Sequence, residues 1–472
     1  MSVLNQASPS TALPDAALAL RPSACPGLLR IVAARDGGIC RIKLPGGELS
    51  AAQAAVIADA SEQHAAGVIE LTNRANLQVR GVRVGHEAAL IAALIDAGLG
   101  PAPATGARQA STLIPASAAD DVRNVMVSPA AGRDPFALFD TTQLSAELLT
   151  LLQTEARFAG LSPKFALSLD GGERLARVDH PHDVWLAATQ TEDGVRFVFG
   201  LGGCPAAVTN AGAGALAAVL PSQVPDLVRA LLHTFLDLAA ADAMRMRHLL
   251  AAHSVDAVLQ HAQTYVDFPL SRDPSLANWR RATPADATLR LGAHAQRVVG
   301  TWHVGGQPPL GRLDTATLRG VATLAQQRGN GTLRMTPWQS VLLPDIASDA
   351  VPAVLAAMNA LGLACDPAQP GTRLIACAGS TGCAKSLADT KADALLLADR
   401  LPDGVDVHLS GCQRSCAAAH RAPYTLLAVA PGAYDLYRRD ASPGFGDCVA
   451  HQLTIEQAAD MLEHLVRSPS DA

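Results

Sequence analysis

An internal repeat limits the folds that this chain can adopt. Displacing the sequence by 264 residues aligns five marked positions without a gap, namely Leu49 with Leu313, Ser50 with Asp314, Gly67 with Gly331, Thr72 with Thr336 and Gly98 with Gly362. Serine and aspartate are common caps at the start of helices, and glycine is common where helices end. Both copies should therefore start and stop their helices at matching places. The repeat predicts a pseudo-twofold architecture in which two halves enclose something between them.

The first copy predicts a compact unit of strands and helices. We expect two strands in 28–47 around a turn at 36–38, a helix over 51–66 capped by Ser50, two strands in 68–82 around a polar turn, and a helix over 86–96. The second copy should repeat this order, starting with the strand-like residues from 289 onward.

Four of the nine cysteines form two close pairs in the second copy. Five residues separate Cys377 from Cys383, and three separate Cys412 from Cys416. An apolar strand should precede each pair, and residues 385–400 predict a helix between them. Four thiolates in this pattern are typical of a [4Fe-4S] cluster or of a structural zinc ion. We favour the cluster, because five residues exceed the usual spacing of about two to four between paired zinc ligands.

The later parts of the two copies match more loosely. Residues 123–133 align with 373–383, a helix predicted over 141–158 with 385–400, and 163–172 with 405–412. The first copy has no cysteine at these places and offers Arg123, Asn124, Arg133 and Lys164 instead. A metal in one half facing cationic side chains in the other predicts a polyanionic ligand between them.

At 472 residues the chain is too long for one ordinary domain. We expect a disordered leader over 1–17, a half domain over 18–100, a larger domain over 101–252, a linker over 253–288, the core of a second half domain over 289–347, and a second larger domain over 348–472. A long helix should end the first larger domain between Val224 and Ala252, and an amphipathic helix should begin at Thr454.

Composition excludes several classes of protein. The net charge is −6, aromatic residues make up only 4% of the chain, and there are no basic runs, so a nucleic-acid binder is not expected. The N-terminus has no signal-peptide pattern and no apolar stretch is long enough to cross a bilayer, which predicts a cytoplasmic protein. Reduced cysteines fit this compartment, and the five outside the pairs should be small buried apolar side chains: Cys25, Cys40, Cys204, Cys365 and Cys448.

Taken together, these motifs resemble the siroheme-dependent nitrite and sulfite reductases. The resemblance rests on the doubled half domain, the turn LTNRANLQVRG, the sequence RNV at Arg123 and the two cysteine pairs, and it covers nearly the whole chain. It implies an α+β fold, with two ferredoxin-like half domains and two larger α/β-layered domains around a tetrapyrrole pocket. It also implies a [4Fe-4S] cluster on the four cysteines, a siroheme bridged through Cys416, and small-anion handling by Arg74, Arg123 and Lys164.

Two positions depart from the reductase pattern. Ala166 stands where reductases acting on sulfite have a second lysine, and Arg414 stands where their second cysteine pair usually has asparagine. Residues 21–47 and 70–82 instead resemble the precorrin-3B synthases, the aerobic cobalamin-biosynthesis branch of the same superfamily. That resemblance implies an iron–sulfur monooxygenase, which uses dioxygen to hydroxylate precorrin-3A at the meso carbon between rings A and D while a ring A acetate closes a γ-lactone.

A corrin precursor is edged with carboxylates, which arginine can bind in bidentate fashion. The candidate substrate-binding residues are Arg74, Arg80, Arg123, Arg133 and Lys164. The alternative interpretation of each is a cation at a strand end or on the surface, with Arg74, Arg123 and Lys164 the better candidates for the pocket.

Activation of dioxygen requires a metal or a flavin, and a cluster with four cysteine ligands has no open position. A mononuclear non-haem iron is therefore a further expectation. Its candidate ligands are Asp179, His180, His182 and Asp183, although Pro181 favours the alternative of a polar turn before a strand.

No glycine-rich dinucleotide fingerprint follows a predicted strand, so electrons should come from an external NAD(P)H-linked reductase or a ferredoxin-like carrier. Two other functions stay open: a siroheme nitrite or sulfite reductase, and a non-catalytic module that binds zinc or a cluster.

Overall fold

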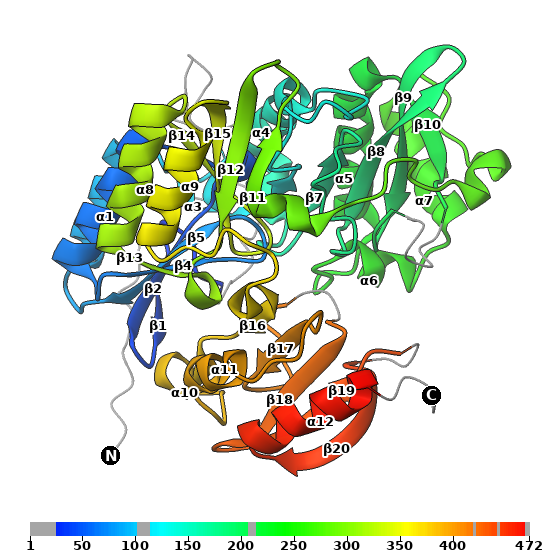
Figure 1. The fold of residues 1–472 in the computed structure, drawn as a ribbon. Helices are drawn as coiled ribbons and strands as arrows, with labels where there is room; N and C mark the ends of the chain where they lie inside the picture. The colour runs from blue at the N-terminus through cyan, green and yellow to red at the C-terminus, as the bar shows by residue number, and fades with distance from the viewer. Residues whose placement is uncertain (1–24, 102–113, 206–213, 419–421, 441–443, 468–472) are drawn as a thin grey trace.

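The computed structural model describes residues 25–101, 114–205, 214–418, 422–440 and 444–467, so the leader expected over 1–17 lies outside the described residues. The described part contains four five-stranded sheets, with helices packed against them. Figure 1 shows the two half domains together at the upper left, the first larger domain at the upper right and the second below them. No helix among the described residues combines the length and the apolar content needed to cross a membrane.

The first half domain contains the strands and helices that its sequence predicts and one further strand, β3. They are β1 Val32–Ala34, β2 Gly37–Ile42, β3 Glu48–Ser50, α1 Ala51–His64, β4 Val68–Leu71, β5 Leu77–Val82 and α2 Glu87–Asp96. Helix α1 starts at a capping box: the Gln53 amide N–H donates to the Ser50 hydroxyl, and the Gln53 side chain accepts from the Ser50 amide. Two N–H groups that a helix start leaves unpaired are thus satisfied.

The second half domain repeats this order. Its elements are β11 Gly292–Ala295, β12 Thr301–Gly306, β13 Arg312–Asp314, α8 Thr315–Arg328, β14 Thr332–Met335, β15 Val341–Ala347 and α9 Val351–Ala360. After displacement by 264 residues the bounds of α1 and α2 coincide with those of α8 and α9. Asp314 caps α8 as Ser50 caps α1, so the repeat seen in the sequence is confirmed.

The two half domains exchange strands. Strand β3 pairs with β14 of the second copy, and β13 pairs with β4 of the first, both antiparallel. The sheet orders are consequently β1-β2-β5-β4-β13 and β11-β12-β15-β14-β3. Buried residues of both copies form one continuous hydrophobic core. Helices α1 and α8 lie side by side, as Figure 1 shows.

Helix α9 lies in this shared core through Val354 and Met358, although the boundary expected after residue 347 would assign it to the next domain. The matching helix α2 contributes Leu90 and Leu94 to the same core. Helix α9 therefore packs with the half domain that its repeat position predicts.

The two larger domains have the same sheet topology. The first contains β6 Val125–Met126, α4 Thr142–Thr154, β7 Leu167–Asp170, β8 Val184–Thr191, β9 Gly194–Leu201, β10 Ala217–Val219 and α5 Val224–Leu238. The second contains β16 Leu374–Ala376, α11 Thr390–Ala398, β17 Val407–Ser410, β18 Tyr424–Ala430, β19 Ala433–Arg438, β20 Asp447–Leu453 and α12 Ile455–Arg467. In each sheet three parallel strands are followed by two antiparallel ones, which explains the looser match between the later parts of the copies.

Two predicted helices are shorter than expected. The helix predicted over 224–252 ends at Leu238, and a separate helix α6, Met246–Leu250, follows. The chain turns between them because the buried Asp183 carboxylate accepts hydrogen bonds from the Arg245 side chain and from the Met246 amide. The helix predicted over 385–400 begins only at Thr390, where Asp389 provides the cap.

We expect the exchanged strands to be required for stability. Leu313 on β13 is 1% exposed in the shared core, so Leu313→Ala should destabilise the protein by about 2–5 kcal/mol. Urea unfolding followed by circular dichroism would measure this loss. The control is Leu396→Ala on α11, where the leucine is 57% exposed, and equal effects of the two changes would contradict the exchanged-strand core.

Candidate functional site

The two cysteine pairs lie at one edge of the sheet in the second larger domain. Cys377 directly follows β16 and Cys412 comes two residues after β17. These strands are parallel neighbours, so their carboxyl ends meet at the same edge. The Gly411 amide donates to the Cys377 sulfur at 3.3 Å, which joins the start of one cysteine loop to the other. The pairs therefore meet in space, as the strand pattern predicted.

All four sulfurs face a common region. Although Cys416 is exposed, partial burial of its thiol and then the neighbouring Cys412, Cys377 and Cys383 sulfurs raise its pKa. Four sulfurs around one zinc ion would lie about 3.8 Å apart, given zinc–sulfur bonds of about 2.3 Å. Among the described residues no three of these sulfurs lie within 4.8 Å of one another. Four thiolates gathered in one region are the ligand set of a [4Fe-4S] cluster.

Glycines allow the cysteine loops to pack closely against their surroundings. A Cβ atom at Gly382, next to Cys383, would lie 2.6 Å from the Arg80 guanidinium, and one at Gly411 would lie 1.8 Å from the Ser386 hydroxyl. Both distances are shorter than a real side chain permits. Glycine is thus required for these contacts by packing.

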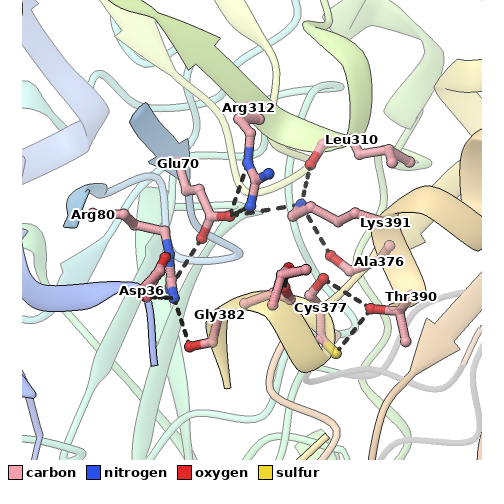
Figure 2. Close-up of polar contacts among 12 residues, drawn as sticks. Asp36, Glu70, Arg80, Leu310, Arg312, Ala376, Cys377, Gly382, Thr390 and Lys391 are labelled. Atoms are coloured by element: carbon pink, nitrogen blue, oxygen red, sulfur yellow. Dashed lines mark hydrogen bonds and ion pairs between the residues drawn. The ribbon is translucent and has the colours of Figure 1, made fainter. Parts of the chain in front are cut away.

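A buried carboxylate connects the cysteine loops to both half domains (Figure 2). Glu70 on β4 forms ion pairs with Arg80 of its own half domain, Arg312 of the second and Lys391 of α11. Burial alone would raise the pKa of Glu70, but the charges of Lys391, Arg80 and Arg312 outweigh burial and hold that pKa below its usual value. Glu70 is therefore an anion held by cations from three separate segments.

Two of these cations continue directly to the cysteine loop (Figure 2). Arg80 donates to the Gly382 carbonyl oxygen at 3.0 Å and also pairs with Asp36. Lys391 donates to the carbonyl oxygens of Leu310 at 2.8 Å and of Ala376 at 3.4 Å, the latter next to Cys377. The network thus fixes the backbone on both sides of the Cys377–Cys383 loop.

The Thr390 hydroxyl also contacts Cys377. It lies 3.0 Å from the Cys377 carbonyl oxygen and 3.3 Å from its sulfur (Figure 2). The hydroxyl proton is directed to the carbonyl oxygen, so the Gly411 amide is the donor to the Cys377 sulfur and the Thr390 hydroxyl is a polar neighbour of it. Hydrogen bonds to ligand sulfurs tune the reduction potential of iron–sulfur clusters.

A small cavity lies where the first half domain meets the first larger domain. It is lined by Leu44, Arg74, Asn76, Arg123, Asn124, Val125, Met126, Ala166 and His182. Its volume is about 20 Å³, enough for a water molecule or one small polar group. Ligand pockets for larger molecules usually measure about 300–1,000 Å³, so a macrocycle could place only an edge substituent there.

Arg74 is the most available cation of this cavity. Burial, followed by the positive charges of Arg245 and Arg41, lowers its pKa to about 10, so the guanidinium is still charged at neutral pH. Within the described residues no hydrogen bond or ion pair occupies this guanidinium. A half-buried arginine whose neighbours include two further arginines favours binding of an anion.

His182 contributes a neutral imidazole to the same cavity. Burial, and after it the charge of Arg74, lowers its pKa to about 3. Its ring is tied to the His180 backbone, while the Nε2 atom has no hydrogen-bond partner among the described residues. A buried nitrogen without a partner is costly, so a ligand that reaches Nε2 would be favoured.

The cavity and the cysteines adjoin at one turn. The Asn73 side-chain amide lies 3.5 Å from the Cys416 carbonyl oxygen, and the next residue, Arg74, lines the cavity. Cys416 raises the pKa of Arg41 on β2, and the charge of Arg41 in turn lowers the pKa of Arg74. The first half and the cysteine-bearing half therefore border one region, as expected for a shared site.

The other candidate cations are already engaged or lie elsewhere. Arg123 lines the cavity, but its guanidinium is held by the Asp120 carboxylate and by the carbonyl oxygens at 99 and 100. Arg133 pairs with Asp345 of β15. Lys164 is exposed in the turn before β7 and is not among the residues that line the cavity.

The structure does not gather the four residues proposed to bind a mononuclear iron. Asp179 pairs with Arg177, and Asp183 is occupied by Arg245 and by two backbone amides. No three of the proposed ligands come within 4.8 Å of one another in the described part of the chain. The segment is a turn before β8, as the alternative interpretation holds.

Sequence reasoning missed several residues of this region. Glu70 and Lys391 carry the ion-pair network, and Asn73 lies inside the quoted turn without having been assigned a role. Lys43 was also missed, and burial lowers the pKa of its side chain to about 7. The only signal available was a charged residue in an otherwise apolar strand or helix face, as for Glu70 in VIEL.

Comparison with protein families gives two matches. Residues 118–270 match the nitrite and sulphite reductase 4Fe-4S domain, and residues 33–97 and 294–361 match the nitrite/sulfite reductase ferredoxin-like half domain. Together they cover more than half of the chain, and the expectation of two ferredoxin-like half domains is confirmed. The range that matches the 4Fe-4S domain contains Cys204 but none of the four paired cysteines.

Individual relatives extend this similarity. The chain is 28% identical to the precorrin-3B synthase of Sinorhizobium sp, over 96% of this chain and 90% of that protein. It is also 28% identical to the ferredoxin–nitrite reductase of Synechococcus elongatus, over 82% of this chain and 76% of that protein. The structure of the Mycobacterium tuberculosis NirA protein aligns with a TM-score of 0.72 and 23% identity, covering 91% and 80% of the two chains. The fold expected from the resemblance is thereby confirmed.

We expect iron and sulfide content to depend on the paired cysteines. Cys377→Ser or Cys412→Ser should remove the broad sulfide-to-iron absorption, because a hard oxygen ligand holds cluster iron poorly. Iron and acid-labile sulfide would be counted in protein kept anaerobic, with Cys204→Ser as the control. Stoichiometric zinc in place of iron in the unaltered protein would contradict the cluster.

The buried Lys391 side chain should stabilise the protein through its contacts with Glu70 and with two backbone carbonyl oxygens. Lys391→Met leaves the Leu310 and Ala376 carbonyl oxygens without their donor and removes one partner of Glu70, so it should cost about 1–3 kcal/mol. Thermal unfolding would measure the loss. Lys385→Met changes an exposed lysine in the segment before α11 and should leave stability unchanged. Identical stability of the two variants would show that the buried network contributes nothing.

Proposed function

This chain belongs to the nitrite and sulphite reductase family, and on that premise we propose that it uses dioxygen to hydroxylate precorrin-3A, with γ-lactone formation, in aerobic cobalamin biosynthesis. The observation that carries the proposal is the extent of similarity. The Sinorhizobium precorrin-3B synthase is matched over 96% of this chain, whereas the Synechococcus nitrite reductase is matched over 82% at the same 28% identity.

The cavity supports this choice over reduction of an oxyanion. Ala166 lines it at the position where sulfite-acting reductases have their second lysine. An alanine supplies no proton, and the neighbouring His182 is neutral at physiological pH because burial lowers its pKa to about 3. Stepwise reduction of nitrite or sulfite consumes several protons, so a pocket without these donors is poorly suited to it.

We assign the first contact with the substrate to Arg74. The cavity holds one small polar group, and a peripheral carboxylate of precorrin-3A has that size. The Arg74 guanidinium can donate two parallel hydrogen bonds to such a carboxylate, and its half-buried side chain is partly shielded from water. His182 Nε2 would accept a hydrogen bond from the macrocycle or from bound water. Arg80, Arg123 and Arg133 instead hold protein groups in place.

Reducing equivalents are proposed to come from outside this chain, in the cytoplasm, from an NAD(P)H-linked reductase or a ferredoxin-like carrier. A [4Fe-4S] cluster held by Cys377, Cys383, Cys412 and Cys416 would supply electrons one at a time when bound. Thr390 and Gly411 would set its potential through their contacts with the Cys377 sulfur. The Asn73 side chain contacts the Cys416 carbonyl oxygen, and the next residue, Arg74, lines the cavity.

The test is the reaction itself, together with the spectrum of the isolated protein. Anaerobically purified protein should show cluster absorption without the intense bands of an iron isobacteriochlorin. With precorrin-3A, dioxygen and an electron donor it should form a product one oxygen atom heavier than precorrin-3A, while the second oxygen atom is reduced to water. Mass spectrometry of the product formed under ¹⁸O₂ would show that the added atom comes from dioxygen. Stoichiometric siroheme with turnover of nitrite or sulfite would establish the alternative, a siroheme reductase.

Arg74 should contribute to affinity for the substrate. Arg74→Gln should weaken binding of precorrin-3A by about 1.5–3 kcal/mol, the range for a hydrogen bond to a charged group, while the iron and sulfide content stays unchanged. Tetrapyrrole affinity would be measured by fluorescence titration. The exposed Arg328→Gln is the matched control and should bind as the unaltered protein does. Unchanged affinity of the Arg74 variant would refute its assigned role.

A further inference from the structure

Three potential metal ligands lie on the outer face of the β19–β20 hairpin, in the second larger domain. Along β19, Tyr434 and Leu436 are fully buried, so the intervening Asp435 faces the other side. Cys448 on β20 is the register partner of Tyr437, the next residue that faces outward. Asp435 and Cys448 therefore share the face of the sheet that points away from the core.

A β-bulge brings His451 to the same face. Leu436 pairs with Ala450, but Tyr434 pairs with Leu453, so Asp435 lies opposite two residues instead of one. The second of these, Gln452, has a positive φ of 53°. A second irregularity precedes His451: Leu436 pairs with Ala450 but Tyr437 pairs with Cys448, so Val449 is an extra residue on β20. Because of it Cys448 and His451, three positions apart, lie on the same face beside Asp435. Bulges often re-aim a side chain in this way at functional sites.

The distances between the ligand atoms match those around one zinc ion. Tetrahedral zinc with bonds of about 2.3 Å to sulfur and about 2.05 Å to nitrogen or oxygen places sulfur about 3.6 Å from nitrogen and nitrogen about 3.3 Å from oxygen. The Cys448 sulfur lies 3.6 Å from His451 Nδ1, and Nδ1 lies 3.2 Å from Asp435 Oδ2. All three ligand atoms lie within 4.8 Å of one another.

Neighbouring groups orient the Asp435 carboxylate and leave the His451 ring free to turn toward a cation. The Gln452 amide donates to Asp435 Oδ1 at 3.0 Å, which orients the carboxylate and leaves Oδ2 toward His451. Metal-binding carboxylates are commonly oriented by such a second hydrogen bond. The His451 side chain is 72% exposed and its Nε2 atom is also near the sulfur, at 3.8 Å, so the ring can rotate to direct either nitrogen.

We propose that Asp435, Cys448 and His451 form a second metal site, separate from the four paired cysteines, which binds one zinc ion with water as the fourth ligand. Thiolate, imidazole and carboxylate together are a ligand set that zinc accepts, and calcium or magnesium would not choose the sulfur. Binding displaces the thiol proton of Cys448 to solvent. Because β20 is the edge strand of its sheet, the metal would fasten that edge to β19.

Zinc binding to the anaerobically purified full-length protein tests this site independently of the proposed function. Zinc would be titrated against a chelating indicator, and its ligands identified by X-ray absorption at the zinc edge, which iron does not disturb. We expect one zinc ion per chain, with one sulfur and the remaining ligands nitrogen or oxygen. Cys448→Ala and His451→Ala should each weaken zinc binding at least tenfold, while the exposed His464→Ala on α12 should not.

The outcomes separate this site from the paired cysteines. Zinc surrounded by three or four sulfurs would place the ion on the paired cysteines and overturn the proposal. Equal zinc affinity in the unaltered protein and in the Cys448 and His451 variants would overturn it as well. Unchanged iron and sulfide content in both variants would show that a loss of zinc does not arise from damage to the cluster loops.

Discussion

The rest of the structure depends on the buried charge of Glu70. A carboxylate that is only 8% exposed is stable as an anion only when cations compensate for its lost hydration. Here Arg80, Arg312 and Lys391 provide that compensation, and each comes from a different part of the chain. The first half domain, the second half domain and the cysteine-bearing domain therefore meet at one charge, and a segment that moved away would leave this charge with fewer compensating cations.

Ion pairs between opposite charges also accompany the strand exchange between the half domains. Displacement by 264 residues relates Glu48 to Arg312 and Glu70 to Arg334. The two exchanged strand pairs accordingly contain the ion pairs Glu70–Arg312 and Glu48–Arg334. Pairing of the first half with another copy of itself would bring Glu48 opposite Glu70. The repeat thus keeps a common backbone while its charges favour the pairing of unlike halves.

The residues proposed to bind the substrate lie where the first half domain borders the first larger domain. Asn73 contacts the backbone of Cys416, and Arg74 beside it reaches the cavity that also contains His182. Arg74 could be named from the resemblance of its turn, and the structure places it at this cavity. Lys164 had equal support from sequence, yet it lies exposed in a turn, because the packing of a loop is not encoded in its motif.

The sequence by itself determined the repeat, the helix caps at Ser50 and Asp314, and the pairing of the cysteines along the chain, because these depend on residues close in sequence or on a fixed period. Only the tertiary structure decided the exchange of strands, the partners of Glu70 and the position of His451 after its bulge. These depend on which distant segments come together. The partners of a buried charge, and the direction of a side chain near an extra residue in a strand, are set by neighbouring segments that lie far away in the sequence.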